Sequence, residues 1–125
     1  MNVNTFDQIG QVLSAYCDGI YSGDVERLRC AFHDSAILWG EVKGQPYHRP
    51  LEEYLTVVRN RKSPQALGES YGMKTLAIEI QGNIALAKVC CRMLGYNYTD
   101  FLSLLYQDNR WGIVAKLFTH TEPDC

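Results

Sequence analysis

The stretch Tyr98–His120, YTDFLSLLYQDNRWGIVAKLFTH, decides the fold. Its two halves are long and rich in aromatic and β-branched side chains, which favour strands. Asp108-Asn109 stands between the halves and suits the tight turn of a hairpin. The stretch also carries one carboxylate, Asp100, and one cation, Lys116, among apolar neighbours. We therefore expect a long hairpin that holds two charged groups in apolar surroundings.

Further strands are expected on both sides of this hairpin in the sequence. Leu76, Ile78 and Ile80 alternate with other residues at the period of a strand, and Gly82-Asn83 is a two-residue hairpin signal. Lys43-Gly44 marks another turn, after an apolar run. The expected strands are residues 36–42, 45–49, 74–81, 84–93, 96–107 and 110–119.

Three helices are expected in the first half of the chain. Apolar residues recur there at three- and four-residue steps, which is the period of a helix. Thr5 is a natural N-cap of the first helix, and Gly23 ends it by accepting a left-handed conformation. Asp24 caps a second, short helix, and Pro50 suits the first turn of a third. The expected helices are residues 2–21, 24–32 and 50–62, so helices precede an antiparallel meander in an α+β pattern.

The bulk composition excludes several classes of function. The chain has 125 residues, the length of one domain, and a net charge of −2 without a block of Lys or Arg, which argues against a nucleic-acid face. No segment approaches the ~20 apolar residues of a membrane span, and residues 1–20 show no signal-peptide pattern. Five cysteines without a C-x-x-C pair indicate reduced thiols. We expect a single cytoplasmic domain over residues 1–125, with neither nucleic-acid nor membrane partners.

The strand at residues 96–107 also predicts a partner. One of its faces offers Asp100, Leu102 and Leu104, and the other offers Phe101 and Leu105. Both faces are apolar at their centre, whereas a sheet that packs on one side alternates more cleanly. One face therefore covers the helices, and a second copy of the chain is the simplest cover for the other. We expect a homodimer through the sheet, but the alternation alone does not say which face carries Asp100.

The order of these elements resembles that of the NTF2-like proteins, which include ketosteroid isomerases, SnoaL-like polyketide cyclases and scytalone dehydratase. Gly23-Asp24 and the run Phe32–Ala36 lie between the same elements as in that family. Within it, YTDFLSL at Tyr98–Leu104 and WGIVAKLF at Trp111–Phe118 are similar to the branch called "putative lumazine-binding". The resemblance implies an α+β cone of the cystatin-like type, with three N-terminal helices packed on a curved antiparallel sheet around a deep cavity.

Such a cavity is the default ligand site, and two residues are the first candidates for its chemistry. The resemblance implies that Tyr16 lies where ketosteroid isomerases have a tyrosine that donates to the substrate oxyanion. It likewise implies a strand position for Asp100, where a carboxyl group in apolar surroundings can act as a donor or a base. The alternatives are a core tyrosine, and an Asp100 that pairs with Lys116 or Arg92 across the sheet.

Glu41 is the third candidate for catalysis. The resemblance implies a general base near the end of the first strand, although Gly40 stands where that base is expected and Glu41 is one residue later. The alternative for Glu41 is a solvated turn carboxylate. His33, His48 and His120 show no metal-ligand spacing, so no metal site is predicted. His33 is expected in a loop at residues 33–35, and His48 and His120 are candidates for the cavity mouth.

Three functions remain open at this point. The first is binding of a small apolar or aromatic ligand, in a pocket lined by Tyr16, Trp39, Tyr54, Asp100 and Lys116. The second is a SnoaL-like or ketosteroid-isomerase-like enzyme, in which Asp100 or Glu41 moves a proton and Tyr16 stabilises an enolate. The third is a dimeric scaffold whose cavity is filled by its own side chains. No cofactor is predicted, because no nucleotide or Gly-rich signature is present.

Overall fold

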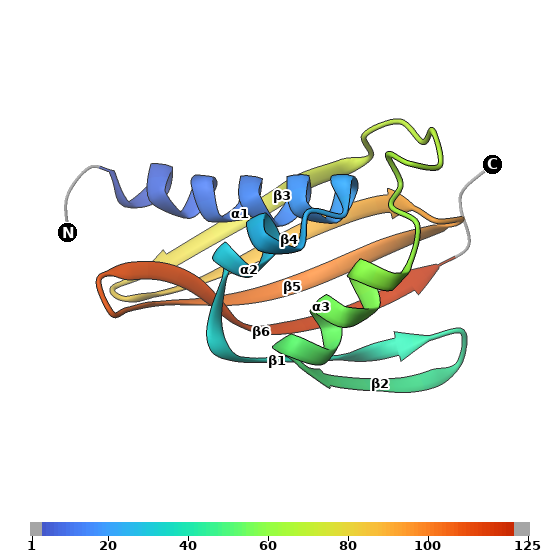
Figure 1. Ribbon diagram of the computed structural model, residues 1–125. Helices are drawn as coiled ribbons and strands as arrows, with labels where there is room; N and C mark the ends of the chain where they lie inside the picture. The colour runs from blue at the N-terminus through green and yellow to red at the C-terminus, as the bar shows by residue number, and fades with distance from the viewer. Residues whose placement is uncertain (1–3, 122–125) are drawn as a thin grey trace.

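A computed structural model describes residues 4–121 (Figure 1). Each expected helix and strand is present in this range, and residues 2 and 3 of the first expected helix lie outside it. In chain order the elements are α1 (Thr5–Ser22), α2 (Val25–Cys30), β1 (Phe32–Val42), β2 (Gln45–Pro50), α3 (Leu51–Asn60), β3 (Met73–Gln81), β4 (Ile84–Met93), β5 (Tyr96–Gln107) and β6 (Arg110–Thr121). No helix in the described range is long and apolar enough to cross a membrane.

The strands form one curved, six-stranded sheet in the order β2-β1-β6-β5-β4-β3. All neighbours are antiparallel except β1 and β6, which are parallel. The sequence did not predict this parallel pair, which joins the first hairpin to the meander. The helices lie on one side of the sheet: α1 contacts β3 and β6, and α3 contacts β1 and β2 (Figure 1).

The helix ends agree with the expected chemistry at two positions and differ at a third. Gly23 is left-handed, with φ of 72°, and ends α1. Asp24 caps α2, because its carboxylate accepts a hydrogen bond from the Arg27 backbone N–H at 3.1 Å. Thr5 is not the N-cap of α1. It is the first helical residue, since Asn4 holds the N-cap position and its carbonyl accepts the Gln8 N–H at 2.8 Å.

The expected loop at residues 33–35 is wrong, because β1 already begins at Phe32. Phe32 pairs with Ile113 of β6, and the register shifts before Ile37 pairs with Ala115. His33 lies within this irregular part of β1 and is buried. Its Nε2 donates to the Leu105 carbonyl at 3.0 Å, so a polar side chain is satisfied there and the strand continues through the shift.

The two faces of the sheet differ in what covers them. On β5, Asp100, Leu102 and Leu104 are buried under the helices, while Phe101 is 46% exposed. This burial places Asp100 on the inner face. The other side, which we call the outer face, carries five large exposed apolar side chains: Trp39, Ile84, Leu86, Phe101 and Leu117.

Two glycines of α1 provide a matched test of the packing between α1 and α2. A Cβ at Gly19 would lie 2.9 Å from the Leu28 Cβ and 3.0 Å from the Leu28 backbone, whereas a Cβ at Gly10 would meet nothing within 4 Å. We expect Gly19→Ala to lower the free energy of unfolding by about 1–3 kcal/mol, because α2 must move. Gly10→Ala should raise it by about 0.5–1 kcal/mol through helix propensity. Urea unfolding measures both, and equal effects would contradict the close contact.

Candidate functional site

A cluster of polar side chains is buried between α1 and the inner face of the sheet. Asp100 is 2% exposed, Lys116 is 6% exposed and Tyr16 is fully buried. The Tyr16 hydroxyl donates to Asp100 Oδ2 at 2.5 Å, and the Cys91 thiol approaches the same oxygen at 3.7 Å. Lys116 Nζ lies 3.9 Å from Asp100 Oδ2. Three donors therefore meet at one carboxylate oxygen.

The periods of the elements bring this cluster together. Asp100 of β5 pairs with Phe118 of β6, and Lys116 pairs with Leu102, so both charges belong to the inward-facing residues of neighbouring strands. Tyr16 belongs to the buried stripe of α1. Its ring also contacts Phe32 edge to face, with centroids 5.9 Å apart. Helix and sheet thus direct one phenol onto one carboxylate.

Burial and charge together fix the protonation of the cluster. Burial and the neighbouring Asp100 charge raise the pKa of Tyr16 well above its ordinary value, so its hydroxyl keeps its proton and donates. Burial alone would lower the pKa of Lys116, but Asp100, Tyr54 and Cys91 together more than offset this, and the net shift of the pKa is upward. Burial and Asp100 also raise the pKa of the Cys91 thiol. The cluster therefore holds a cationic Lys116, a neutral phenol and a neutral thiol around Asp100.

A cavity of about 140 Å³ opens next to this cluster. It lies between α3 and residues of β1, β2, β4, β5 and β6. Most of its wall is aromatic or aliphatic, and three of its residues are charged. The lining residues are Val42, Tyr47, Tyr54, Val57, Arg61, Met93, Tyr98, Asp100, Lys116 and Phe118.

Lys116 contacts several groups at the polar end of the cavity. Its Nζ donates to the Tyr54 hydroxyl at 3.4 Å. It also lies 4.8 Å from the centre of the Tyr54 ring and 5.1 Å from that of Phe118, within the range of cation–π attraction. The cation is thus compensated by a carboxylate and by aromatic faces, although it lies in a largely apolar wall.

The structure brings three of the five expected pocket residues to the cavity wall: Tyr54, Asp100 and Lys116. Tyr16 contacts Asp100, but it is not part of the wall. The alternative interpretation of Asp100 as the partner of Lys116 is also observed, and the two interpretations are compatible because the pair itself borders the cavity.

Trp39 and Glu41 do not reach the cavity, which corrects the sequence-based expectation. Leu38 of β1 is buried on the inner face. Trp39 and Glu41 lie one and three residues later, so they point to the opposite face, and both are exposed. Gly40 leaves room for the ring of Phe118, because a Cβ at Gly40 would lie 2.6 Å from that ring. The position where the resemblance implied a base therefore has no side chain.

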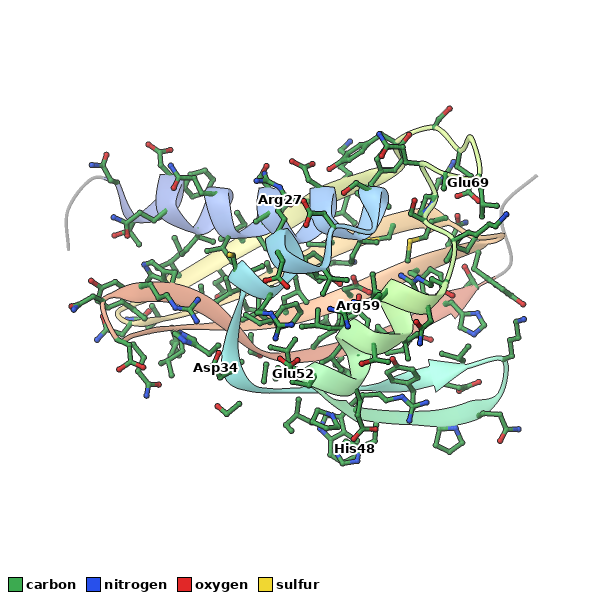
Figure 2. The ribbon with its side chains drawn as sticks, in the orientation of Figure 1. Arg27, Asp34, His48, Glu52, Arg59 and Glu69 are labelled. Carbon is green, nitrogen blue, oxygen red and sulfur yellow. The ribbon has the colours of Figure 1, made fainter. Side chains whose placement is uncertain are left out.

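The histidines are also not part of the cavity wall. His48 stacks on Trp39 with ring centroids 3.9 Å apart, and Figure 2 shows it beyond β2, on the side away from α3. His120 Nε2 accepts the Lys43 backbone N–H at 2.8 Å, which anchors the β1–β2 turn to β6. Within residues 4–121, no three His, Cys, Asp or Glu side chains gather as a metal site would need.

Several wall residues were missed by the sequence analysis. Phe118 has the same alternation as Lys116 in β6 and pairs with Asp100, so the strand period was a usable signal for it. Arg61 follows the last residue of α3, and nothing in the local sequence indicates that it turns toward the sheet.

Comparison with known proteins gives a family and a fold. Residues 4–119 match the model of the family described as "Putative lumazine-binding". An NTF2-like protein of unknown function from Shewanella baltica is 27% identical, with a TM-score of 0.82 and 98% of each chain covered. One from Methylobacillus flagellatus is 26% identical, with a TM-score of 0.82, covering 97% of this chain and 95% of that one.

A third structure, of an NTF2-like protein of unknown function from Silicibacter pomeroyi, shares the fold at 20% identity. Its TM-score is 0.85, and 97% of this chain and 100% of that one are covered. No protein with a curated description matches the sequence. The relatives therefore establish the architecture and leave the function to be argued from the site.

The buried Tyr16–Asp100 bond predicts a distinct response to alkaline pH. At pH 8, Tyr16→Phe should lower the free energy of unfolding by about 1.5–3 kcal/mol, because a hydrogen bond to a charged group is lost. The pKa of Tyr16 is raised in the folded state, so its contribution is complete below the unfolded value near 10 and declines as the pH rises further. The gap between wild type and Tyr16→Phe should then narrow by about 1.4 kcal/mol per pH unit above 10.

Urea unfolding at pH 8, 10 and 11 measures this gap. Tyr21→Phe is the control, because the Tyr21 hydroxyl donates to the Glu69 carbonyl and does not contact Asp100. If the difference in unfolding free energy between wild type and Tyr16→Phe stays constant from pH 8 to pH 11, the pKa of Tyr16 is not raised in the folded state and the prediction is wrong.

Proposed function

This chain belongs to the NTF2-like family described as "Putative lumazine-binding", and from that premise we propose that it binds a small apolar or aromatic ligand in the cavity beneath α3. The observation that carries the proposal is the cavity itself. Its volume of about 140 Å³ is close to that of an engineered apolar cavity that holds one benzene molecule. Its wall combines an apolar body with a few polar groups, as ligand sites do.

The geometry supports binding better than proton transfer. In an isomerase-like reaction, the Tyr16 hydroxyl would have to face the substrate, but it donates to Asp100 and is not on the cavity wall. Asp100 Oδ2 already accepts hydrogen bonds from Tyr16 and Cys91 and pairs with Lys116, so this oxygen is occupied by the protein's own donors. Glu41 lies on the outer face and has no route to the cavity. A scaffold without a ligand is supported less, because the protein's own side chains leave this space open.

A blocking substitution tests the binding proposal. Val57 lines the cavity from α3, whereas Thr56 beside it is exposed. We expect toluene to bind wild type and Thr56→Phe alike, and to lose at least tenfold in affinity for Val57→Phe, because the new ring fills the space that a ligand ring would take. Ligand-observed NMR titration measures the dissociation constants. Lumazine, the compound in the family description, is titrated in parallel.

Binding of toluene to Val57→Phe with the wild-type affinity would place the ligand elsewhere. Circular dichroism of the three proteins must agree, so that the comparison concerns the cavity and not the fold. If neither toluene nor lumazine binds the wild type, the proposal fails.

We also propose that the outer face is the surface through which two copies of the chain associate. Phe101, Leu117 and Trp39 follow one another across β5, β6 and β1 in register, each about half exposed. Ile84 and Leu86 extend the apolar surface onto β4. Large exposed apolar side chains that gather on one face of a sheet mark interaction sites more often than free surface. A twofold dimer would bury the same patch on both copies.

Sedimentation tests this association. We expect a dimer at micromolar concentration for wild type and a monomer for Phe101→Asp, because a carboxylate within an apolar interface would lose its hydration on association. Leu67→Asp is the control, since Leu67 is similarly exposed but lies in the connection between α3 and β3. A wild-type monomer, or a Phe101→Asp variant that remains dimeric, would contradict the proposal.

We place the protein in the cytoplasm, on the basis of its thiols. Cys17, Cys30, Cys90 and Cys91 are all free, although Cys90 and Cys91 are adjacent in β4. Their side chains point to opposite faces of the strand, so they have no geometry for a bridge. Free thiols of this number persist in a reducing compartment. Cell fractionation tests this placement.

A further inference from the structure

Arg61 carries a hydrogen-bonding group for which residues 4–121 supply no partner. Its side chain is half-buried and lines the cavity. Its Nη2 atom is buried, and nothing within residues 4–121 accepts a hydrogen bond from it. Arg61 also belongs to none of the ion pairs of the described residues. A buried N–H of a charged group without an acceptor is costly, so this arrangement is explained best by an acceptor that arrives from outside.

The charges on the cavity wall indicate what kind of acceptor this is. Asp100, Lys116 and Arg61 are the charged residues among those that line the cavity. Asp100 and Lys116 are an ion pair and offset one another. Burial raises the pKa of Tyr47 and Tyr98, so these two wall phenols carry no charge near neutral pH. Within residues 4–121, this leaves one positive charge on the cavity wall, that of Arg61, without compensation.

The cavity also limits the size and shape of the ligand. A volume of about 140 Å³ admits one ring, and the wall around it includes the rings of Tyr47, Tyr54, Tyr98 and Phe118. A guanidinium group binds a carboxylate with two parallel N–H bonds, and a singly charged group matches the single uncompensated charge. On these grounds we propose that the ligand is a one-ring aromatic carboxylate, whose acid group binds Arg61 and whose ring enters the aromatic part of the cavity. This inference rests on the binding function proposed above and names its ligand class.

Benzoate and benzamide form a matched pair of probes, because they have nearly the same shape and differ in charge. We expect wild type to bind benzoate at least tenfold more tightly than benzamide, as a charge-assisted hydrogen bond allows. Arg61→Met should lose this preference while its affinity for benzamide stays within about threefold of wild type. Isothermal titration calorimetry at low and moderate salt measures both compounds on each protein.

Arg59→Met is the matched control. Arg59 is exposed on α3, two residues before Arg61, and Figure 2 labels it on that helix. It removes the same charge from the same region without touching the cavity wall, so it should keep the preference for benzoate. A comparable loss in both variants would show general electrostatic attraction and overturn the assignment to Arg61.

A second readout requires no ligand. Because Nη2 of Arg61 is unpaired in the free protein, Arg61→Met should unfold at the same or a higher urea concentration than wild type. A marked loss of stability would mean that the guanidinium has a structural partner, and the inference fails. If wild type binds toluene well but binds benzoate no better than benzamide, the ligand class is wrong and the binding function stands. If none of these three compounds binds and lumazine does not bind either, the binding function fails as well.

Discussion

The buried carboxylate of Asp100 is the constraint on which the inner part of this structure depends. An ionised carboxylate at 2% exposure is stable only when donors surround it, and here they come from three separate elements: Tyr16 of α1, Cys91 of β4 and Lys116 of β6. α1 must therefore lie on the sheet in one rotation and at one height. The apolar stripe of α1 stabilises its packing on the sheet, but apolar contacts alone tolerate small shifts of the helix. The hydrogen bond of 2.5 Å from Tyr16 to Asp100 does not tolerate them.

The parallel contact between β1 and β6 is what turns this buried pair into the end of a cavity. This contact places β1 and β2 next to β6, at the edge of the meander. Because α3 packs on β1 and β2, it covers the region next to Lys116 and Phe118 (Figure 1). Gly40 matters at this junction because it lets the Phe118 ring lie against β1. A larger residue there would push the ring toward the cavity or separate the two strands. Gly40 of β1 thus helps to set the volume of the cavity under α3.

How far the sequence could predict this structure depended on the distance over which each feature is determined. Strand and helix positions follow from local periods and turns such as Gly82-Asn83, and each predicted element is present, although the predicted loop at residues 33–35 belongs to β1. Tyr54, Asp100 and Lys116 were also found, because a polar or amphipathic side chain within an apolar pattern is visible locally. Trp39 was expected in the pocket and Glu41 as a base implied by the resemblance, but both are exposed, which agrees with the alternative of a solvated carboxylate for Glu41. The face of Asp100, the parallel pair and the direction of Arg61 depend on how distant segments pack, which no local pattern contains.

The arrangement of charges explains why one cavity can be both apolar and selective. A neutralised Asp100–Lys116 pair at the inner end presents polar atoms without a net field, since each charge has its partner within the protein. An isolated cation at that depth would attract any anion and would be costly to bury. Arg61 is different, because it lies half-buried after the end of α3 and its charge has no partner among the residues that the structure describes. Separating a compensated pair from an uncompensated cation gives the cavity a direction, so that a ligand with one polar and one apolar end has a single favourable orientation.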